Sequence, residues 1–194
     1  MIIRSNSLQI PEIMSNILLL IDIQNDYFPG GKMELAHPVL AAENTAKILQ
    51  LFRKKVLPVI YMQHIADKKA SFFNPHTKGI EINSIVQPTA SEIIIQKSYP
   101  NSFRNTNLLE LIRDYGMSDL VICGMMTHMC IESTVRAAYD LGFNCTIISD
   151  ACATKDLIFD SCHLPAENVQ KTFLSALDGT FGKVMSTIEY LKNN

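Results

Sequence analysis

The chain has 194 residues, of which 47% are apolar and 19% charged, and its formal net charge is −2. This length fits one domain, and the composition is too apolar and too weakly charged for a disordered protein. Basic residues cluster no further than Arg53-Lys54-Lys55 and Lys68-Lys69, so we expect no nucleic acid partner.

Targeting signals and paired cysteines are not apparent. No apolar run approaches the ~18 residues that cross a bilayer, and residues 1–16 lack the apolar core of a signal peptide. We therefore expect a cytoplasmic protein without membrane contact. Residues 1–13 show no periodic pattern and are predicted to be an N-terminal tail, which leaves a domain over 14–194. The five cysteines contain no C-x-x-C pair, which predicts reduced thiols.

The first predicted elements form a strand-helix-strand unit. Residues 17–23 and 56–62 are short apolar runs without alternation, a pattern typical of strands buried on both faces of a parallel sheet. Between them, apolar and small residues at helical spacing predict an amphipathic helix over 39–54. Residues 93–96, 120–123 and 145–149 predict three further strands.

Helices alternate with these later strands. We predict helices over 105–115 and 129–141, because Gly116 and Gly142 then fall at the left-handed position after a helix end. After Ser149 the sequence predicts a loop, a helix over about 165–177, a short strand over 183–185 and a helix over 187–192. This order predicts a three-layer α/β/α fold with a mainly parallel, six-stranded, Rossmann-like sheet. Its active site should lie beyond the carboxyl ends of the strands.

Three reactive side chains stand at or just beyond those strand ends: Asp22, Lys97 and Cys130. Asp22 lies within an apolar strand, so its carboxylate needs a buried partner, and a lysine from a nearby strand end would serve. Spacing alone leaves a structural ion pair and a catalytic one equally open.

Cys130 favours the catalytic interpretation. Thr127 is the expected N-cap of the following helix, which would place Cys130 about one turn in, near the positive end of the helix. That position favours a thiolate and supplies backbone N–H groups for an oxyanion. A free cysteine is more often a small buried apolar residue, and we expect this of the other four, Cys123, Cys145, Cys152 and Cys162.

These residues together resemble the isochorismatase-like cysteine hydrolases, whose relatives include nicotinamidases and N-carbamoylsarcosine amidohydrolase. The resemblance runs from about residue 16 to residue 191. It rests on Leu-Leu-Leu-Ile-Asp-Ile-Gln-Asn-Asp-Tyr, on Gln-Lys-Ser-Tyr-Pro-Asn-Ser-Phe and, most specifically, on Cys-Gly-Met-Met-Thr-His-Met-Cys. A weaker similarity covers residues 149–154, His163 and residues 181–187.

The resemblance implies a catalytic triad in which Asp22 accepts the thiol proton, Cys130 attacks a carbonyl and Lys97 keeps Asp22 ionised. It also implies a cis peptide bond between Met125 and Met126, with the amides of Met126 and Cys130 forming an oxyanion hole. The reaction would hydrolyse a C–N bond of a small amide or carbamoyl compound through a thioester, without a cofactor. Related proteins are oligomeric, so we expect a homodimer or homotetramer.

Four side chains near these motifs are candidates for contacts with a small-molecule substrate. Tyr27 and Phe103 could stack on a flat or apolar substrate, although aromatic residues more often belong to the core. Gln24 and Asn101 are candidates for polar contacts.

The chain departs from nicotinamidases in the region after the second strand. Nicotinamidases carry a metal-binding loop there, with an aspartate, several histidines and usually a tryptophan. This chain has no tryptophan and offers only His64, Asp67 and His76, so we expect no metal site, and nicotinamide becomes a doubtful substrate.

Two other functions are weighed against amide hydrolysis. Some members of the resembled family cleave the vinyl ether of isochorismate, often without the cysteine, so Cys130 favours carbonyl chemistry. A receiver-like signalling domain also places acidic residues, here Asp22 and Asp26, after its first strand. That architecture requires an aspartate where this chain has Lys97.

Overall fold

The central sheet contains six parallel strands, as the sequence predicted. The computed structural model describes residues 16–194, so the predicted tail over 1–13 lies outside the described residues. Six strands pair in parallel in the order β3-β2-β1-β4-β5-β8. They are β1 (Asn16–Ile21), β2 (Val59–His64), β3 (Ile93–Lys97), β4 (Asp119–Met125), β5 (Asn144–Ala153) and β8 (Lys183–Met185). The predicted α/β fold with a six-stranded parallel sheet is confirmed.

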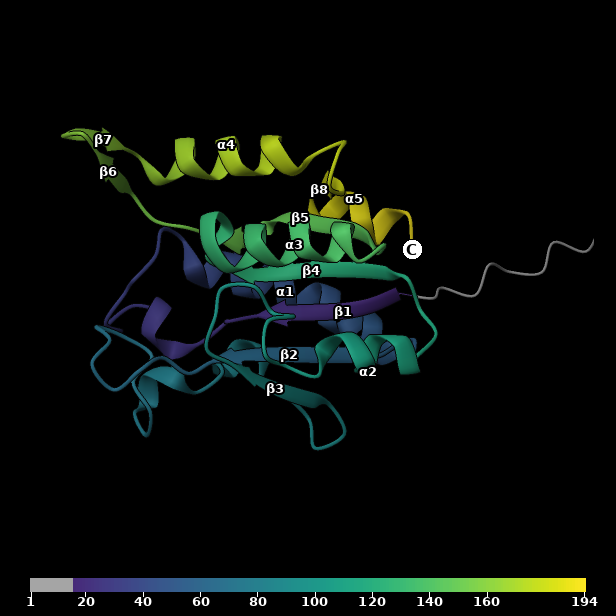
Figure 1. Ribbon diagram of the computed structural model, residues 1–194. Coiled ribbons are helices and arrows are strands. Elements are labelled where there is room, and N and C mark those ends of the chain that lie inside the picture. Colours follow the sequence, from purple (N-terminus) through teal and green to yellow (C-terminus); the bar gives the residue numbers. More distant parts are fainter. Residues whose placement is uncertain (1–15) are drawn as a thin grey trace, which may run out of the picture.

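Helices cover both faces of this sheet and complete three layers (Figure 1). α1 (Pro38–Lys54) and α5 (Thr187–Lys192) contact each other on one face, and α2 (Leu108–Asp114) and α3 (Glu132–Asp140) pack on the other. α4 (Ala166–Leu177) lies outside α3. Within residues 16–194 no helix is both long and apolar enough to cross a membrane.

The two helical layers explain why β1 is apolar at every position. Leu18 and Leu20 belong to the core beneath α1, whereas Ile17, Leu19 and Ile21 belong to the core beneath α2 and α3. Successive side chains of a strand point to opposite faces, so a strand with both faces covered loses the usual apolar-polar alternation.

The second strand begins later than predicted, at Val59 rather than at Val56. The N–H of Leu57 donates to the carbonyl of Phe52 at 2.9 Å, and Val56 has a φ of +56°. This is the left-handed turn that ends many helices, formed here without the usual glycine. Val56 consequently points outward, with 89% of its surface exposed.

The predicted loop after Ser149 is also wrong. β5 continues to Ala153, and a hairpin follows, formed by β6 (Leu157–Phe159) and β7 (Cys162–Leu164). Asp160 and Ser161 both have positive φ values, +48° and +59°, as a two-residue hairpin turn requires. Neither residue is the glycine that usually identifies such a turn in a sequence.

The strand order reverses between β1 and β4. The chain runs outward from β1 to β2 and β3, then returns to place β4 on the other side of β1. In open parallel sheets this switch point creates a crevice at the carboxyl ends of the two strands. Gly124 lets β4 approach β1 there, because its φ is +143° and an added Cβ would lie 2.0 Å from the carbonyl oxygen of Ile21.

We expect Gly124→Ala to destabilise the fold clearly more than Gly142→Ala. Gly142 also has a positive φ, +90°, but an added Cβ would meet nothing within 4 Å. Its replacement should therefore cost only backbone strain, about 1–2 kcal/mol. Gly124→Ala adds a backbone clash to that strain. Urea unfolding measures both free energies, and equal losses would contradict the close-packing argument.

Candidate active site

Asp22, Lys97 and Cys130 come together at the switch point. Lys97 Nζ donates a hydrogen bond to Asp22 Oδ2 at 2.7 Å. The sulfur of Cys130 lies within 4.8 Å of an Asp22 carboxylate oxygen. The three residues are 0%, 3% and 4% exposed, respectively. The structure thus unites the predicted side chains in one buried cluster, which we call the triad.

Asp22 is held at the end of β1 by its own backbone. Its φ is +53°, and its N–H donates to the carbonyl of Met62 in β2 at 3.0 Å. The lysine occupies Oδ2, whereas Oδ1 is buried and has no hydrogen-bond partner within residues 16–194. One oxygen of the carboxylate is therefore available to accept a proton inside the site.

Cys130 lies in a π-helical turn, Thr127–Ile131, which leads into α3. The N–H of Ile131 donates to the carbonyl of Met126 at 3.2 Å, the five-residue spacing of that turn. The peptide bond between Met125 and Met126 is cis, as the resemblance implied. Single π-helical turns are frequent at functional sites because they redirect a side chain without ending the helix.

The predicted N-cap role of Thr127 is wrong. Thr127 is the first residue of the π-helical turn, and Met126 occupies the capping position. The Thr127 hydroxyl instead donates to the carbonyl of Ala153 at 3.2 Å, which ties the start of this turn to the end of β5.

Burial and two charged neighbours act on the thiol of Cys130. Burial raises the pKa of the Cys130 thiol, and the Asp22 carboxylate raises that pKa further, whereas the Lys97 ammonium lowers it by less. Desolvation penalises the charged form, and here its effect on the pKa of Cys130 exceeds that of the Lys97 ammonium. These effects disfavour the thiolate, so a nearby base that removes the proton during attack, as the resemblance implies for Asp22, suits this environment.

His64 is a fourth member of the cluster, and the sequence had suggested it only as one of three scattered metal-ligand candidates. Its Nδ1 lies 3.2 Å from Lys97 Nζ and 3.8 Å from Asp22 Oδ2. The signal that could have identified it is its position as the last residue of β2, directly beside Lys97 in the register of β2 and β3.

The other two metal-ligand candidates do not join the cluster. Asp67 and His76 are exposed, and an Asp67 carboxylate oxygen accepts the N–H of Lys69. Within residues 16–194, the group of possible metal donors is Asp22, His64 and Cys130. The Lys97 ammonium lies within hydrogen-bond distance of both Asp22 and His64, so a positive charge already occupies that position.

Two of the predicted substrate contacts, Gln24 and Phe103, already have partners within the protein. The Gln24 amide is wholly buried, donates to the carbonyls of His64 and Ile80 at 2.9 Å each, and accepts the N–H of His64 at 2.7 Å. The Phe103 ring stacks on Phe143, with centroids 6.0 Å apart. Phe143 follows the end of α3, whereas Cys130 precedes the beginning of that helix.

The other two candidates lie in different surroundings. Tyr27 is buried against Phe72 and Phe73, with centroid distances of 5.8 and 4.6 Å. Burial raises its pKa, and Asp22 and Cys130 add to that rise, which places the phenol near the triad. Asn101 is half-buried, and its side-chain oxygen accepts the N–H of Phe103 at 2.9 Å.

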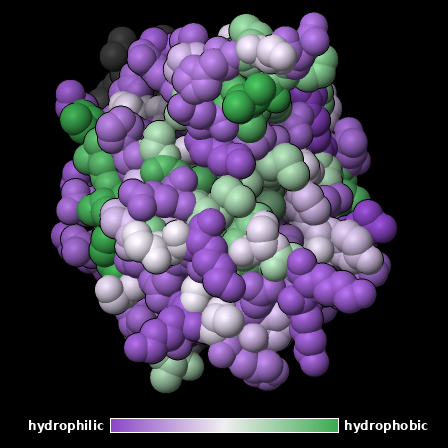
Figure 2. All heavy atoms as spheres, turned by 90° about the vertical axis from the view of Figure 1, so that its left-hand side faces the viewer, coloured by the Kyte–Doolittle hydropathy of each residue, from purple (hydrophilic) through white to green (hydrophobic). Residues whose placement is uncertain are grey.

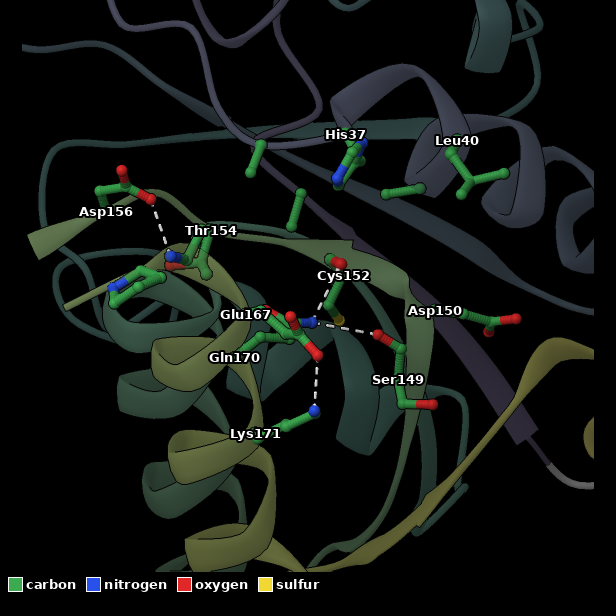
Figure 3. Close-up of a pocket in the computed structure, with 15 residues that line it drawn as sticks. His37, Leu40, Ser149, Asp150, Cys152, Thr154, Asp156, Glu167, Gln170 and Lys171 are labelled. Atoms are coloured by element: carbon green, nitrogen blue, oxygen red, sulfur yellow. Dashed lines mark hydrogen bonds and ion pairs between the residues drawn. The ribbon is translucent and has the colours of Figure 1, made fainter.

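A cavity of about 610 Å³ lies between the start of α1, the end of β5 and the start of α4 (Figure 3). None of the triad side chains lines it. Its wall includes Thr154, whose hydroxyl contacts His128 Nδ1 at 2.5 Å, two residues before Cys130. Figure 2 looks onto this edge of the molecule, where hydrophilic atoms predominate and apolar patches are interspersed.

Comparison with known proteins identifies the family. The family model for the isochorismatase domain matches residues 16–189. The chain belongs to the isochorismatase family. This membership makes it a hydrolase of that family and leaves no basis for the receiver-like alternative.

Similar proteins support this assignment along most of the chain. The uncharacterized isochorismatase family protein YddQ of Bacillus subtilis is 47% identical over 180 residues, covering 92% of this chain and 100% of YddQ. The crystal structure of an isochorismatase from Pseudomonas putida has a TM-score of 0.87 and 32% identity, with 91% of this chain and 90% of that chain covered. Ureidoacrylate amidohydrolase RutB of Serratia proteamaculans is 27% identical over 170 residues, covering 69% and 68% of the two chains.

We expect Lys97→Met to lower the free energy of unfolding by about 3–5 kcal/mol, because it leaves the buried Asp22 carboxylate without its counter-charge. The double variant Asp22→Asn/Lys97→Met removes both charges and should recover part of that loss. Denaturant unfolding of the single and double variants measures the coupling. A double variant as unstable as the sum of the two single variants would contradict the ion pair.

Asp22→Asn should increase the rate at which iodoacetamide alkylates Cys130 at pH 8. The substitution removes the carboxylate that raises the pKa of the thiol and keeps the lysine that lowers it, so the thiolate fraction grows. The measurement belongs in a Cys162→Ser background, because Cys162 is exposed. Cys130→Ser in that background gives the residual labelling to subtract. Slower alkylation in Asp22→Asn/Cys162→Ser than in Cys162→Ser would contradict the effect assigned to the Asp22 carboxylate on the pKa of Cys130.

Proposed function

We propose that this isochorismatase-family protein is a cysteine hydrolase that cleaves a C–N bond of a small amide or carbamoyl compound. Asp22, Lys97 and Cys130 are its catalytic residues in this proposal. The observation that carries it is a buried thiol within 4.8 Å of a carboxylate oxygen, at the switch point of the sheet. Burial also raises the pKa of this thiol. A base beside a protonated nucleophile is the arrangement that nucleophilic catalysis requires.

The first half-reaction follows from the position of this base. Asp22 takes the thiol proton as the sulfur attacks the carbonyl carbon, and a tetrahedral intermediate forms. Asp22 then gives the proton to the leaving nitrogen, the C–N bond breaks, and a thioester remains on Cys130.

The second half-reaction uses the same carboxylate as a base. Asp22 removes a proton from water as the water attacks the thioester, and the proton returns to the sulfur when the carboxylic acid leaves. Lys97 contributes a fixed positive charge beside Asp22 through both halves, which favours the ionised base.

The oxyanion of each intermediate needs donors that are already in place. We assign this role to the backbone amides of Met126 and Cys130, which lie on the two sides of the turn that begins after the cis bond. Preorganised N–H groups of this kind contribute about 2.7–4 kcal/mol each to transition-state stabilisation.

Vinyl ether hydrolysis of isochorismate is the second candidate chemistry. It needs proton donation to the substrate rather than a sulfur nucleophile, so the thiol beside Asp22 favours the amide. RutB, an amidohydrolase by name, is a relative consistent with that choice.

We further propose that the protein is cytoplasmic and forms a homodimer or homotetramer, as expected from the sequence.

The test is a hydrolysis screen with nicotinamide, ureidoacrylate, simple carboxamides, carbamoyl compounds and isochorismate. We expect ammonia or amine release from an amide or carbamoyl compound, lowered at least about 1000-fold in Cys130→Ala and about 10²–10⁴-fold in Asp22→Asn. Cys145→Ala, which removes another buried cysteine, is the matched control and should retain activity. Pyruvate release from isochorismate that is unchanged in Cys130→Ala would favour the vinyl ether alternative.

A further inference from the structure

The Lys97 ammonium has three acceptors fixed around it. Its Nζ lies 2.7 Å from Asp22 Oδ2, 3.1 Å from the carbonyl oxygen of Tyr99 and 3.2 Å from His64 Nδ1. An ammonium carries three N–H donors and no acceptor. These three acceptors equal its donors in number, the Cys130 sulfur is a further neighbour, and the Lys97 side chain is wholly buried.

This geometry determines which nitrogen of His64 carries a proton. Because lysine can only donate, a hydrogen bond between Lys97 Nζ and His64 Nδ1 requires Nδ1 to offer its lone pair, which assigns the proton of the neutral ring to Nε2. The electrostatics agree: burial lowers the pKa of His64, Lys97 lowers it further, and the opposing effect of Asp22 does not compensate.

Contacts on three sides hold His64, two of them to its backbone and one to its ring. The Gln24 amide binds both the N–H and the carbonyl of His64 in a two-point clamp, and the residue pairs with Lys97 in the sheet. The ring also lies against Phe73, with centroids 5.7 Å apart. The wholly buried Gln24, which the sequence had suggested as a substrate contact, thus fixes the backbone of a residue that faces the triad.

We propose that His64 is a positioning residue, whose unprotonated Nδ1 keeps the Lys97 ammonium in place while Asp22 gains and loses its proton. This inference rests on the proposed function. When Asp22 takes the thiol proton it becomes neutral, and its attraction for Lys97 falls. The acceptors His64 Nδ1 and Tyr99 O remain unchanged throughout, so the ammonium does not move between steps.

The groups that face His64 determine how pH affects its contact with Lys97. They are Asp22 after β1, Lys97 on β3 and Cys130 in the π-helical turn, together with the uncharged ring of Phe73. Protonation of His64 would remove the lone pair and bring a second positive charge beside the ammonium. Lys97 would then be displaced from Nδ1, so the arrangement persists only above the pH at which His64 titrates.

The first test is imidazole NMR on the intact protein. In the wild type we expect the proton on Nε2, and a titration midpoint for His64 below the ordinary histidine value. In Lys97→Met the midpoint should rise, because the neighbouring cation is lost and Asp22 remains. An unchanged midpoint for His64 in Lys97→Met would contradict the contact between the two side chains. A wild-type ring protonated on Nδ1 would overturn the proposal without the need for any variant.

The second test compares His64→Asn with His64→Leu, two side chains of similar size. The asparagine oxygen can accept from Lys97, whereas leucine cannot. The probe is iodoacetamide at pH 8 in the Cys162→Ser background. We expect alkylation of Cys130 to be about tenfold slower in His64→Leu than in His64→Asn, which corresponds to a shift of one unit in the pKa of Cys130. Equal rates would contradict the positioning role.

The two proposals fail in different ways. If hydrolysis survives in Cys130→Ala, the proposed function is wrong whatever the state of His64. If Cys130→Ala abolishes hydrolysis while His64→Leu alkylates as fast as His64→Asn, the nucleophile stands and only the positioning role is lost.

Discussion

The site depends on one interaction, the ion pair between Asp22 and Lys97. Both charges are removed from water, and neither is tolerable in the interior without the other. Once the pair is in place, the neighbouring thiol of Cys130 experiences burial and a carboxylate that disfavour its ionisation, and an ammonium that only partly offsets them. Burial and the paired carboxylate thus both disfavour a thiolate at Cys130. A proton can move between Cys130 and Asp22 without creating net charge in the buried site.

The fold brings these groups together by a simple rule of parallel sheets. Asp22, His64 and Lys97 each stand at or just past the carboxyl end of a strand, and the strands β1, β2 and β3 are neighbours. Cys130 comes from the segment after β4, on the other side of β1. Four separate stretches of sequence therefore converge where the strand order reverses, and Gly124 lets β4 lie close enough to β1 for the sulfur to reach the carboxylate.

The sequence predicted what depends on burial and periodicity. Apolar runs revealed the strands, because both faces of the sheet are covered, and the ends of those runs pointed to Asp22 and Lys97. Features that depend on local backbone geometry were missed: Val56 ends a helix in a left-handed conformation that favours glycine, and Asp160 with Ser161 turns a hairpin without one. The extent to which the Cys130 sulfur is buried could not be predicted either, because it depends on packing around the helix start that the sequence does not show. His64 and Gln24 lacked a recognisable motif, and their importance arises from contacts across the sheet.

The three acceptors of Lys97 differ in a way that matters for a reaction cycle. Asp22 is an anion whose charge changes when it takes a proton, whereas His64 Nδ1 and the carbonyl oxygen of Tyr99 are neutral acceptors. His64 is also held by its pairing with Lys97 in the sheet. If Asp22 were the only acceptor, the Lys97 ammonium would shift its position each time Asp22 gained or lost its proton. Neutral acceptors decouple the position of the cation from the protonation state of the base, so the base can titrate while the electrostatic field that it works in stays fixed. A protonated His64 could no longer accept a hydrogen bond from Lys97 and would repel it. The lowered pKa of His64 keeps the ring neutral and so preserves this contact.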